Sequence, residues 1–159
     1  MLDCNNEHIK NSILLEFAKT VELFDLSPLE ARLFAFLYIE GVPLTLDQMS
    51  EALGKSKTSM STGVRSLVDL NLVKRVWKKG VRKDLFQANE QLFKQFMSFY
   101  MKKWIVATED RKEALLELQS ELEQSALDQS NEHIHNKLND LLDFHNKLDV
   151  FFKEASKNK

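Results

Sequence analysis

Positively charged side chains are concentrated in one short segment of the chain, between Lys55 and Lys83. Nine lysines and arginines lie in this segment against a single acid, Asp69, although the formal net charge of the whole chain is −2. Ammonium and guanidinium groups bind phosphates, so a basic segment on an otherwise acidic chain is typical of nucleic-acid binding. The competing interpretation is a charged surface that is only solvated, on a domain that binds other proteins and not DNA.

The first half of this segment has the pattern of a two-sided helix. Ser56 is a candidate N-cap, and the helix is expected to continue to about Leu70. Its buried side is predicted to consist of Met60, Val64, Leu67 and Val68. The other side carries small, hydroxylated and basic residues, namely Lys57, Thr58, Ser59, Ser61, Thr62 and Arg65. Such a side can approach DNA closely and hydrogen-bond to phosphates and base edges, so all of these residues and Ser56 are candidate DNA contacts.

The second half changes to the two-residue period of β-strands. The segments Leu72–Trp77 and Asp84–Ala88 flank a loop with Gly80 at its turn, which predicts a β-hairpin. Its candidate DNA-binding cations are Lys74, Arg75, Lys78, Lys79, Arg82 and Lys83. Arg82 is expected to enter a minor groove, because narrow A·T tracts attract guanidinium groups.

The elements before this segment complete a recognisable order. An amphipathic helix is predicted over residues 7–24, and Ser27 begins a second helix that stops at Gly41. A third, short helix begins at Thr45 and ends at Gly54. Helix, turn, helix and basic hairpin in this order predict a winged helix-turn-helix, in a fold that is mainly α with a small β-hairpin wing.

Two long helices are predicted after Asn89, one from Leu92 to about Leu122 and one over residues 131–152, with a break at 125–130. Their apolar stripes are too extensive to be buried against so small a head, which predicts a homodimer. The expected organisation has three parts. Residues 1–26 contribute a helix to the dimer interface, 27–89 form the DNA-binding domain, and 90–159 form a helical dimerisation region.

Aromatic residues gather where the hairpin precedes the long helix. Trp77, Phe96, Tyr100 and Trp104 are candidate members of a cage for a quaternary ammonium ligand, since such cations bind to ring faces. The alternative is a hydrophobic junction, because aromatic residues at helical spacing also pack in cores.

Other chemistries find little support in the sequence. His133 and His135 lie two apart on a predicted helix without further ligands, so no metal site or cofactor is expected. No phosphate-binding loop or nucleophile elbow is present, and no enzymatic activity is expected. The chain has neither a signal sequence nor an apolar run of about 18 residues, which predicts a cytoplasmic protein without membrane contact. Cys4, the single cysteine, is either incidental or a redox-sensing thiol.

Several of these residues also match a known family pattern. The segment Pro43–Gly54, the residues Ser56-Lys57 and Ser59-Met60-Ser61, and the segment Leu72–Asp84 resemble the GbsR-like branch of the MarR superfamily of bacterial regulators. The branch has Leu-Val-x-x-Val-Trp followed by Gly-x-Arg-Lys-Asp, here Leu72 to Trp77 and Gly80 to Asp84. The chain departs from it at Asp69-Leu70-Asn71, where Asp-Trp-Gly is usual, and at Leu85-Phe86, where an aromatic pair is frequent.

The resemblance implies a repressor of genes for uptake or synthesis of compatible solutes. Together with the predicted homodimer and winged helix, it leads us to expect a regulator that reads a pseudo-palindromic operator in double-stranded DNA. Some members of the branch sense choline or glycine betaine, which makes these compounds candidate effectors, and others act without an effector. Two alternatives therefore remain open: an effector-independent repressor, and a winged-helix module that binds protein rather than DNA.

Overall fold

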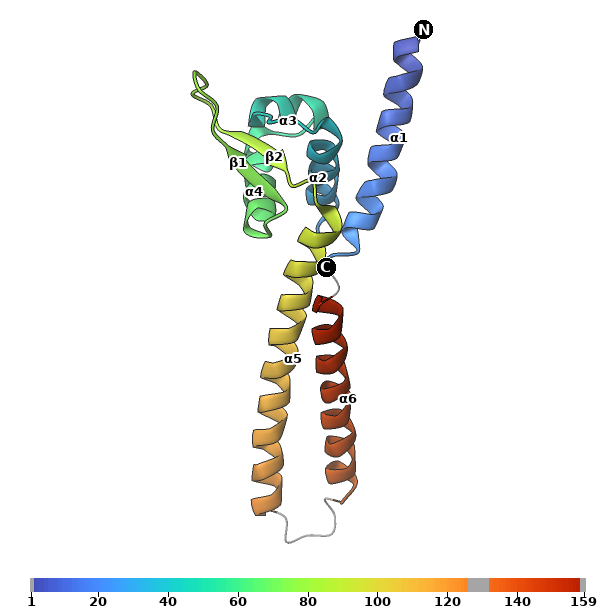
Figure 1. Ribbon diagram of the computed structural model, residues 1–159, viewed down its shortest axis with the longest axis vertical. Helices are drawn as coiled ribbons and strands as arrows, with labels where there is room; N and C mark the ends of the chain where they lie inside the picture. Colours follow the sequence, from blue (N-terminus) through green and yellow to red (C-terminus); the bar gives the residue numbers. More distant parts are fainter. Residues whose placement is uncertain (1, 126–131, 158–159) are drawn as a thin grey trace. The chain divides into compact units, whose positions relative to one another are not determined.

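The computed structural model describes residues 2–125 and 132–157 (Figure 1). Its elements are α1 (Leu2–Glu22), α2 (Pro28–Glu40), α3 (Leu46–Leu53), α4 (Lys57–Asp69), β1 (Val73–Val76), β2 (Leu85–Ala88), α5 (Leu92–Ser125) and α6 (Glu132–Lys157). They divide into two compact units, Met1–Gln95 and Phe96–Lys159. Over the described ranges, every helix is too short or too polar to cross a lipid bilayer.

Local capping signals set the ends of the helices in the first unit. Ser27 and Thr45 begin α2 and α3 with capping boxes, in which each hydroxyl accepts a hydrogen bond from the backbone N–H three residues later. Gly41 and Gly54 end these helices in the left-handed region, with φ of 66° and 64°. Ser56 caps α4 by accepting from the backbone N–H of Ser59. The predicted starts of all three helices are confirmed.

The predicted hairpin is also present. Strands β1 and β2 pair antiparallel, with Val73 opposite Ala88 and Val76 opposite Leu85. Leu44, before α3, exchanges two backbone hydrogen bonds with Phe86 and so joins the hairpin to the helices. Gly80 turns the loop with φ of 82°. Helices α3 and α4 with this hairpin form a winged helix-turn-helix in a mainly α fold, as the sequence predicts.

Helix α2 lies at the centre of the first core. Its Leu33, Phe34 and Leu37 are almost completely buried, as are Met49 of α3, Met60 and Leu67 of α4, and Leu72 beside the hairpin. Helix α1 packs against α2 through the ring of Phe17, which lies 6.1 Å from that of Phe34 and 5.6 Å from that of Tyr38. Lys10 of α1 also pairs with Glu40 of α2 at 2.5 Å. Helix α1 therefore belongs to the same compact unit as the winged helix.

The second unit pairs the residues of α5 from Phe96 onward with α6. Trp104 and Glu109 contact Phe152 and Lys153 near the end of α6, whereas Gln119, further along α5, bonds to Asn139 near the start of α6, so the two helices run antiparallel. Helix α6 extends five residues past its predicted end. The predicted break at 125–130 lies, apart from Ser125, outside the described residues. The predicted three-part organisation depends on a dimer and stays a prediction.

Candidate nucleic-acid interface

Helix α4 has the two sides that the sequence predicts, with one correction. Met60, Val64 and Leu67 are buried, with at most 1% of their surface exposed. Val68 was predicted among them, but 36% of its surface is exposed, because it lies in the last turn at the edge of the buried side. The exposed or half-buried side carries the seven predicted candidates of this helix and its cap, Ser56, Lys57, Thr58, Ser59, Ser61, Thr62 and Arg65.

Close contact with α2 fixes the position of α4. Gly63 faces Leu33, and a Cβ at Gly63 would lie only 3.1 Å from a methyl carbon of that leucine. One turn later, the Ser66 hydroxyl donates a hydrogen bond to Glu30, whose other carboxylate oxygen accepts from the backbone N–H of Ser27 at 3.0 Å. A single carboxylate thus caps α2 and anchors α4.

Hydrogen bonding changes the acidity of this carboxylate. Burial raises the pKa of Glu30, but hydrogen bonds from Ser66 and Ser27 outweigh burial and hold the pKa below its ordinary value of 4.5. Glu30 therefore stays ionised at neutral pH while it accepts these bonds.

The hairpin, or wing, displays its cations to solvent. Lys74, Arg75, Lys78, Lys79, Arg82 and Lys83 are all exposed. Arg75 forms an ion pair of 2.5 Å with Asp84, across the strands, and its guanidinium carbon lies 6.0 Å from the centre of the Phe86 ring. The backbone N–H of Val81 donates to the carbonyl of Lys78, which closes the turn at the tip.

Asp47 connects the start of α4 to the wing. One of its carboxylate oxygens lies 3.3 Å from the ammonium of Lys57 and the other lies 2.6 Å from that of Lys83. The hydrogen bond from Lys83, and to a smaller extent that from Lys57, lower the pKa of Asp47 below its ordinary value. The cations at the start of α4 and at the end of the wing loop therefore lie beside each other, although 26 positions separate them in the sequence.

Ion pairing divides the nine cations of the basic segment into two groups. Lys57, Lys83 and Arg75 have acidic partners. The others have no ion pair within the described parts of the chain, and they are Lys55, Arg65, Lys74, Lys78, Lys79 and Arg82. The sequence identified all of these cations but not the pairing of Lys57 and Lys83 with Asp47. No local signal could have revealed a contact between residues 47 and 83.

Three of the four candidate cage residues contact one another in the second unit. The ring of Tyr100 lies 6.3 Å from that of Phe96, nearly parallel to it, and 5.8 Å from that of Trp104. The ring of Trp104 in turn lies 5.6 Å from the ring of Phe152 on α6. Trp77 belongs to the first unit, where 82% of its surface is exposed.

The remaining candidates lie apart from this site. Within residues 2–125 and 132–157, no three histidine, cysteine or acidic side chains are grouped as metal ligands. Cys4 is a free and exposed thiol.

The chain is similar in sequence to known bacterial regulators. The chain is 35% identical over 117 residues to the HTH-type transcriptional repressor GbsR and 32% identical over 116 residues to the HTH-type transcriptional repressor OpcR, both of Bacillus subtilis (strain 168). These matches cover 74% and 73% of the chain but slightly less than two thirds of the relatives, 64% of GbsR and 63% of OpcR. GbsR and OpcR are named as transcriptional repressors and not as enzymes.

A third relative is YvaV of the same organism, which is named as an HTH-type transcriptional regulator. It is 30% identical to the chain over 150 residues, which cover 89% of the chain and 84% of YvaV. A crystal structure described only as a transcriptional regulator has the same fold, with a TM-score of 0.58 and 16% identity over 94% of this chain and 99% of that one. The family model described as MarR family matches residues 24–78, which include α2, α3, α4 and β1. The chain belongs to the MarR family.

Proposed function

We propose that this chain is a transcriptional regulator that binds double-stranded DNA through α4 and the wing. The observation that carries the proposal is the exposed set of basic and hydroxylated side chains on α4, whose first lysine, Lys57, lies near Lys83 of the basic wing, since both pair with Asp47. A helix of 13 residues with buried apolar residues on one side and short hydroxylated residues on the other suits the major groove.

The two elements divide the work of recognition. Arg65 and the hydroxyls of α4 reach base edges and phosphates in the major groove. Lys78 and Lys79 contact phosphates from the wing, and Arg82 enters the neighbouring minor groove. An ion pair already holds Arg75, which therefore positions the wing more than it binds DNA.

The salt dependence of DNA binding tests this proposal. Fluorescence anisotropy with a labelled duplex of the upstream region should show an affinity loss of about 10³- to 10⁵-fold between 50 and 200 mM salt, as expected for about six to ten phosphate contacts. Replacing Arg65→Gln and Arg82→Gln together should weaken binding at least about tenfold.

The matched control replaces Lys19→Gln and Lys147→Gln, which removes the same charge from exposed lysines outside the basic segment. This control should bind DNA nearly as well as the unmodified chain. Wild-type binding that is absent or independent of salt would contradict the proposal and favour a protein-binding module.

Family resemblance supports a proposal for the mode of action and the regulated genes. GbsR and OpcR are named as repressors, which supports repression as the mode of action of this chain. The GbsR-like pattern from Leu72 to Asp84 supports genes for uptake or synthesis of compatible solutes as the targets, with the regulator acting in the cytoplasm. An osmolyte transporter gene beside the coding sequence would support this assignment.

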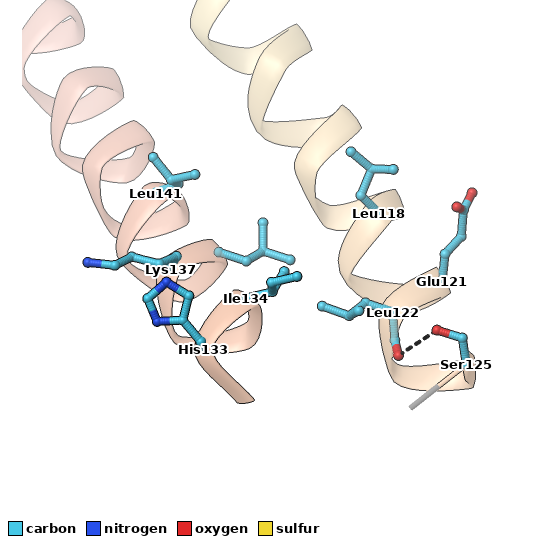
Figure 2. A pocket seen from close by; sticks show the side chains of 9 residues that line it. Leu118, Glu121, Leu122, Ser125, His133, Ile134, Lys137 and Leu141 are labelled. Carbon is cyan, nitrogen blue, oxygen red and sulfur yellow. Dashed lines mark hydrogen bonds between the residues drawn. The ribbon is translucent and has the colours of Figure 1, made fainter. Parts of the chain in front are cut away.

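A homodimer is the proposed assembly. Helix α6 exposes a row of large apolar side chains that α5 does not cover: Ile134, Leu141, Phe144 and Phe151, each with 48–64% of its surface exposed. Near the start of α6, a groove of about 650 Å³ is lined by Leu118 and Leu122 of α5, and Figure 2 shows Leu122 pointing toward α6. A second copy of the chain would remove these surfaces from water.

The proposal also includes a small effector, a quaternary ammonium compound that binds in the second unit. Beside Trp104, a cavity of about 400 Å³ opens between α5 and α6, lined among others by Phe152 and Arg111. Ring faces attract a quaternary ammonium group, and choline and glycine betaine carry one. Binding of such a ligand in the cavity beside Trp104 would change the separation of the two α4 helices in a dimer and so lower the affinity for DNA.

Intrinsic fluorescence tests the effector, because Trp77 and Trp104 are the only tryptophans. Choline or glycine betaine should change the emission saturably, and Trp104→Phe should remove most of the change. Trp77→Phe is the matched variant and shows whether Trp77 takes part. No change with either compound at millimolar concentration would contradict the cage and favour an effector-independent repressor.

A further inference from the structure

We infer that Asp47 is an internal counter-ion that competes with DNA phosphates for Lys57 and Lys83, and so limits sequence-independent DNA affinity. The inference rests on the proposed function, since it concerns how strongly the same surface binds DNA.

The geometry of Asp47 suits such a role. Its two carboxylate oxygens are divided between two lysines of different elements, with Lys57 at 3.3 Å and Lys83 at 2.6 Å. Both lysines belong to the basic surface, one at the first position of α4 and one at the end of the wing loop. Asp47 itself lies in the first turn of α3, and 46% of its side chain is exposed.

The contact adds little to the stability of the fold. The accessible fractions are 46% for the side chain of Asp47 and 61% and 66% for those of Lys57 and Lys83, and ion pairs exposed to this degree contribute little to folding. The helix-turn-helix is instead held by buried residues such as Met49, Met60 and Leu67. The contact therefore acts on the strength of DNA binding and not on folding.

DNA phosphates and Asp47 would occupy the same position around these lysines. A phosphate that approaches Lys57 or Lys83 must displace the carboxylate or remain beside it, and two anions close together repel each other. Because the two lysines lower the pKa of Asp47, its carboxylate is ionised at neutral pH. Each lysine thus contributes less to phosphate binding than an unpaired lysine such as Lys78 or Lys79.

The other acids of this region differ from Asp47. Asp84 pairs with Arg75 alone, and Glu51 lies exposed on the same helix as Asp47, without an ion pair in the described part of the chain. Glu51 therefore offers a matched control, since Glu51→Gln removes the same charge from the same helix but releases no lysine.

The test compares Asp47→Asn with Glu51→Gln in binding to a labelled duplex of random sequence, about three helical turns long. Each additional neutralised phosphate steepens the salt dependence by about 0.9 in log–log slope, and Asp47→Asn releases up to two lysines. The affinity ratio of the variant to the wild type should therefore exceed one, and it should be about three- to twelvefold larger at 50 mM than at 200 mM salt.

A double-mutant cycle separates this effect from a change in folding. In a chain with Lys57→Gln and Lys83→Gln, the added Asp47→Asn should leave DNA affinity unchanged, because no lysine remains to be released. Thermal unfolding of each variant verifies that the fold is intact.

Three outcomes would overturn the inference. Equal or weaker DNA binding by Asp47→Asn would show that Asp47 positions the lysines or has no effect. An equal gain in Glu51→Gln would reduce the effect to net charge. If the wild type binds neither this duplex nor the duplex of the upstream region at low salt, the proposed function fails and the inference with it, whereas the first two outcomes leave the proposed function intact.

Discussion

At the scale of single residues, Glu30 links the start of α2 to the last turn of α4. Its carboxylate accepts from the backbone N–H of Ser27 and from the hydroxyl of Ser66 on α4. A charged acceptor forms stronger hydrogen bonds than a neutral one, so the negative charge itself contributes to the docking of α4. The orientation of the candidate DNA-reading helix therefore depends on one ionised side chain.

This charge makes part of the folding stability dependent on pH. We predict that Glu30→Gln, which keeps the size and one acceptor oxygen, lowers the free energy of unfolding by about 1 to 2 kcal/mol at pH 7. Because the folded-state pKa is below the ordinary 4.5, this contribution is present above pH 4.5 and is lost as the pH falls through the lowered value. Urea unfolding at pH 7 and near pH 3 measures the difference.

The exposed Glu51→Gln serves as the control and should change stability little at either pH. A difference between wild type and Glu30→Gln that persists or grows in acid would contradict the assignment of the stabilisation to the ionised carboxylate.

At the scale of elements, the parts that the sequence predicts best are those with local signals. The starts of α2, α3 and α4 follow from Ser27, Thr45 and Ser56, because a capping residue satisfies backbone N–H groups only three positions away. Helix α1 lacks such a cap signal, and its start at Leu2 lies five residues before the predicted one. Strand β1 ends at Val76 rather than Trp77, since Val76 opposite Leu85 is the last paired position.

The candidate site divides in the same way. The basic segment is contiguous in the sequence, so its residues and their side of α4 could be predicted from charge and helical period. The docking of Gly63 on Leu33 and the bridge from Asp47 to Lys83 could not, because they join residues 30 and 36 positions apart. Such contacts depend on how whole elements pack, which no local pattern encodes.

At the scale of the whole molecule, helix α6 exposes apolar side chains that a second molecule would bury. Side chains on this helix fall into two adjacent rows. Leu138 and Leu142 are buried against α5, whereas Leu141 and Phe144, one turn apart, are about half exposed. Burying a leucine or phenylalanine contributes about 1.5 to 3 kcal/mol, so a row of four such residues on each copy could stabilise a dimer. The groove in Figure 2 continues this surface through Ile134 and Leu118.

We therefore predict that the chain sediments at about 37 kDa, twice its mass of 18.5 kDa, and that Phe144→Glu raises the dissociation constant at least about a hundredfold. A carboxylate in this row would lose its hydration on association without gaining a partner. Asn136→Glu places the same charge on an exposed polar position of α6 and should leave the dimer intact. Analytical ultracentrifugation over a range of concentrations distinguishes these cases. A wild-type monomer, or equal dissociation of both variants, would mean that something other than a second copy covers this row.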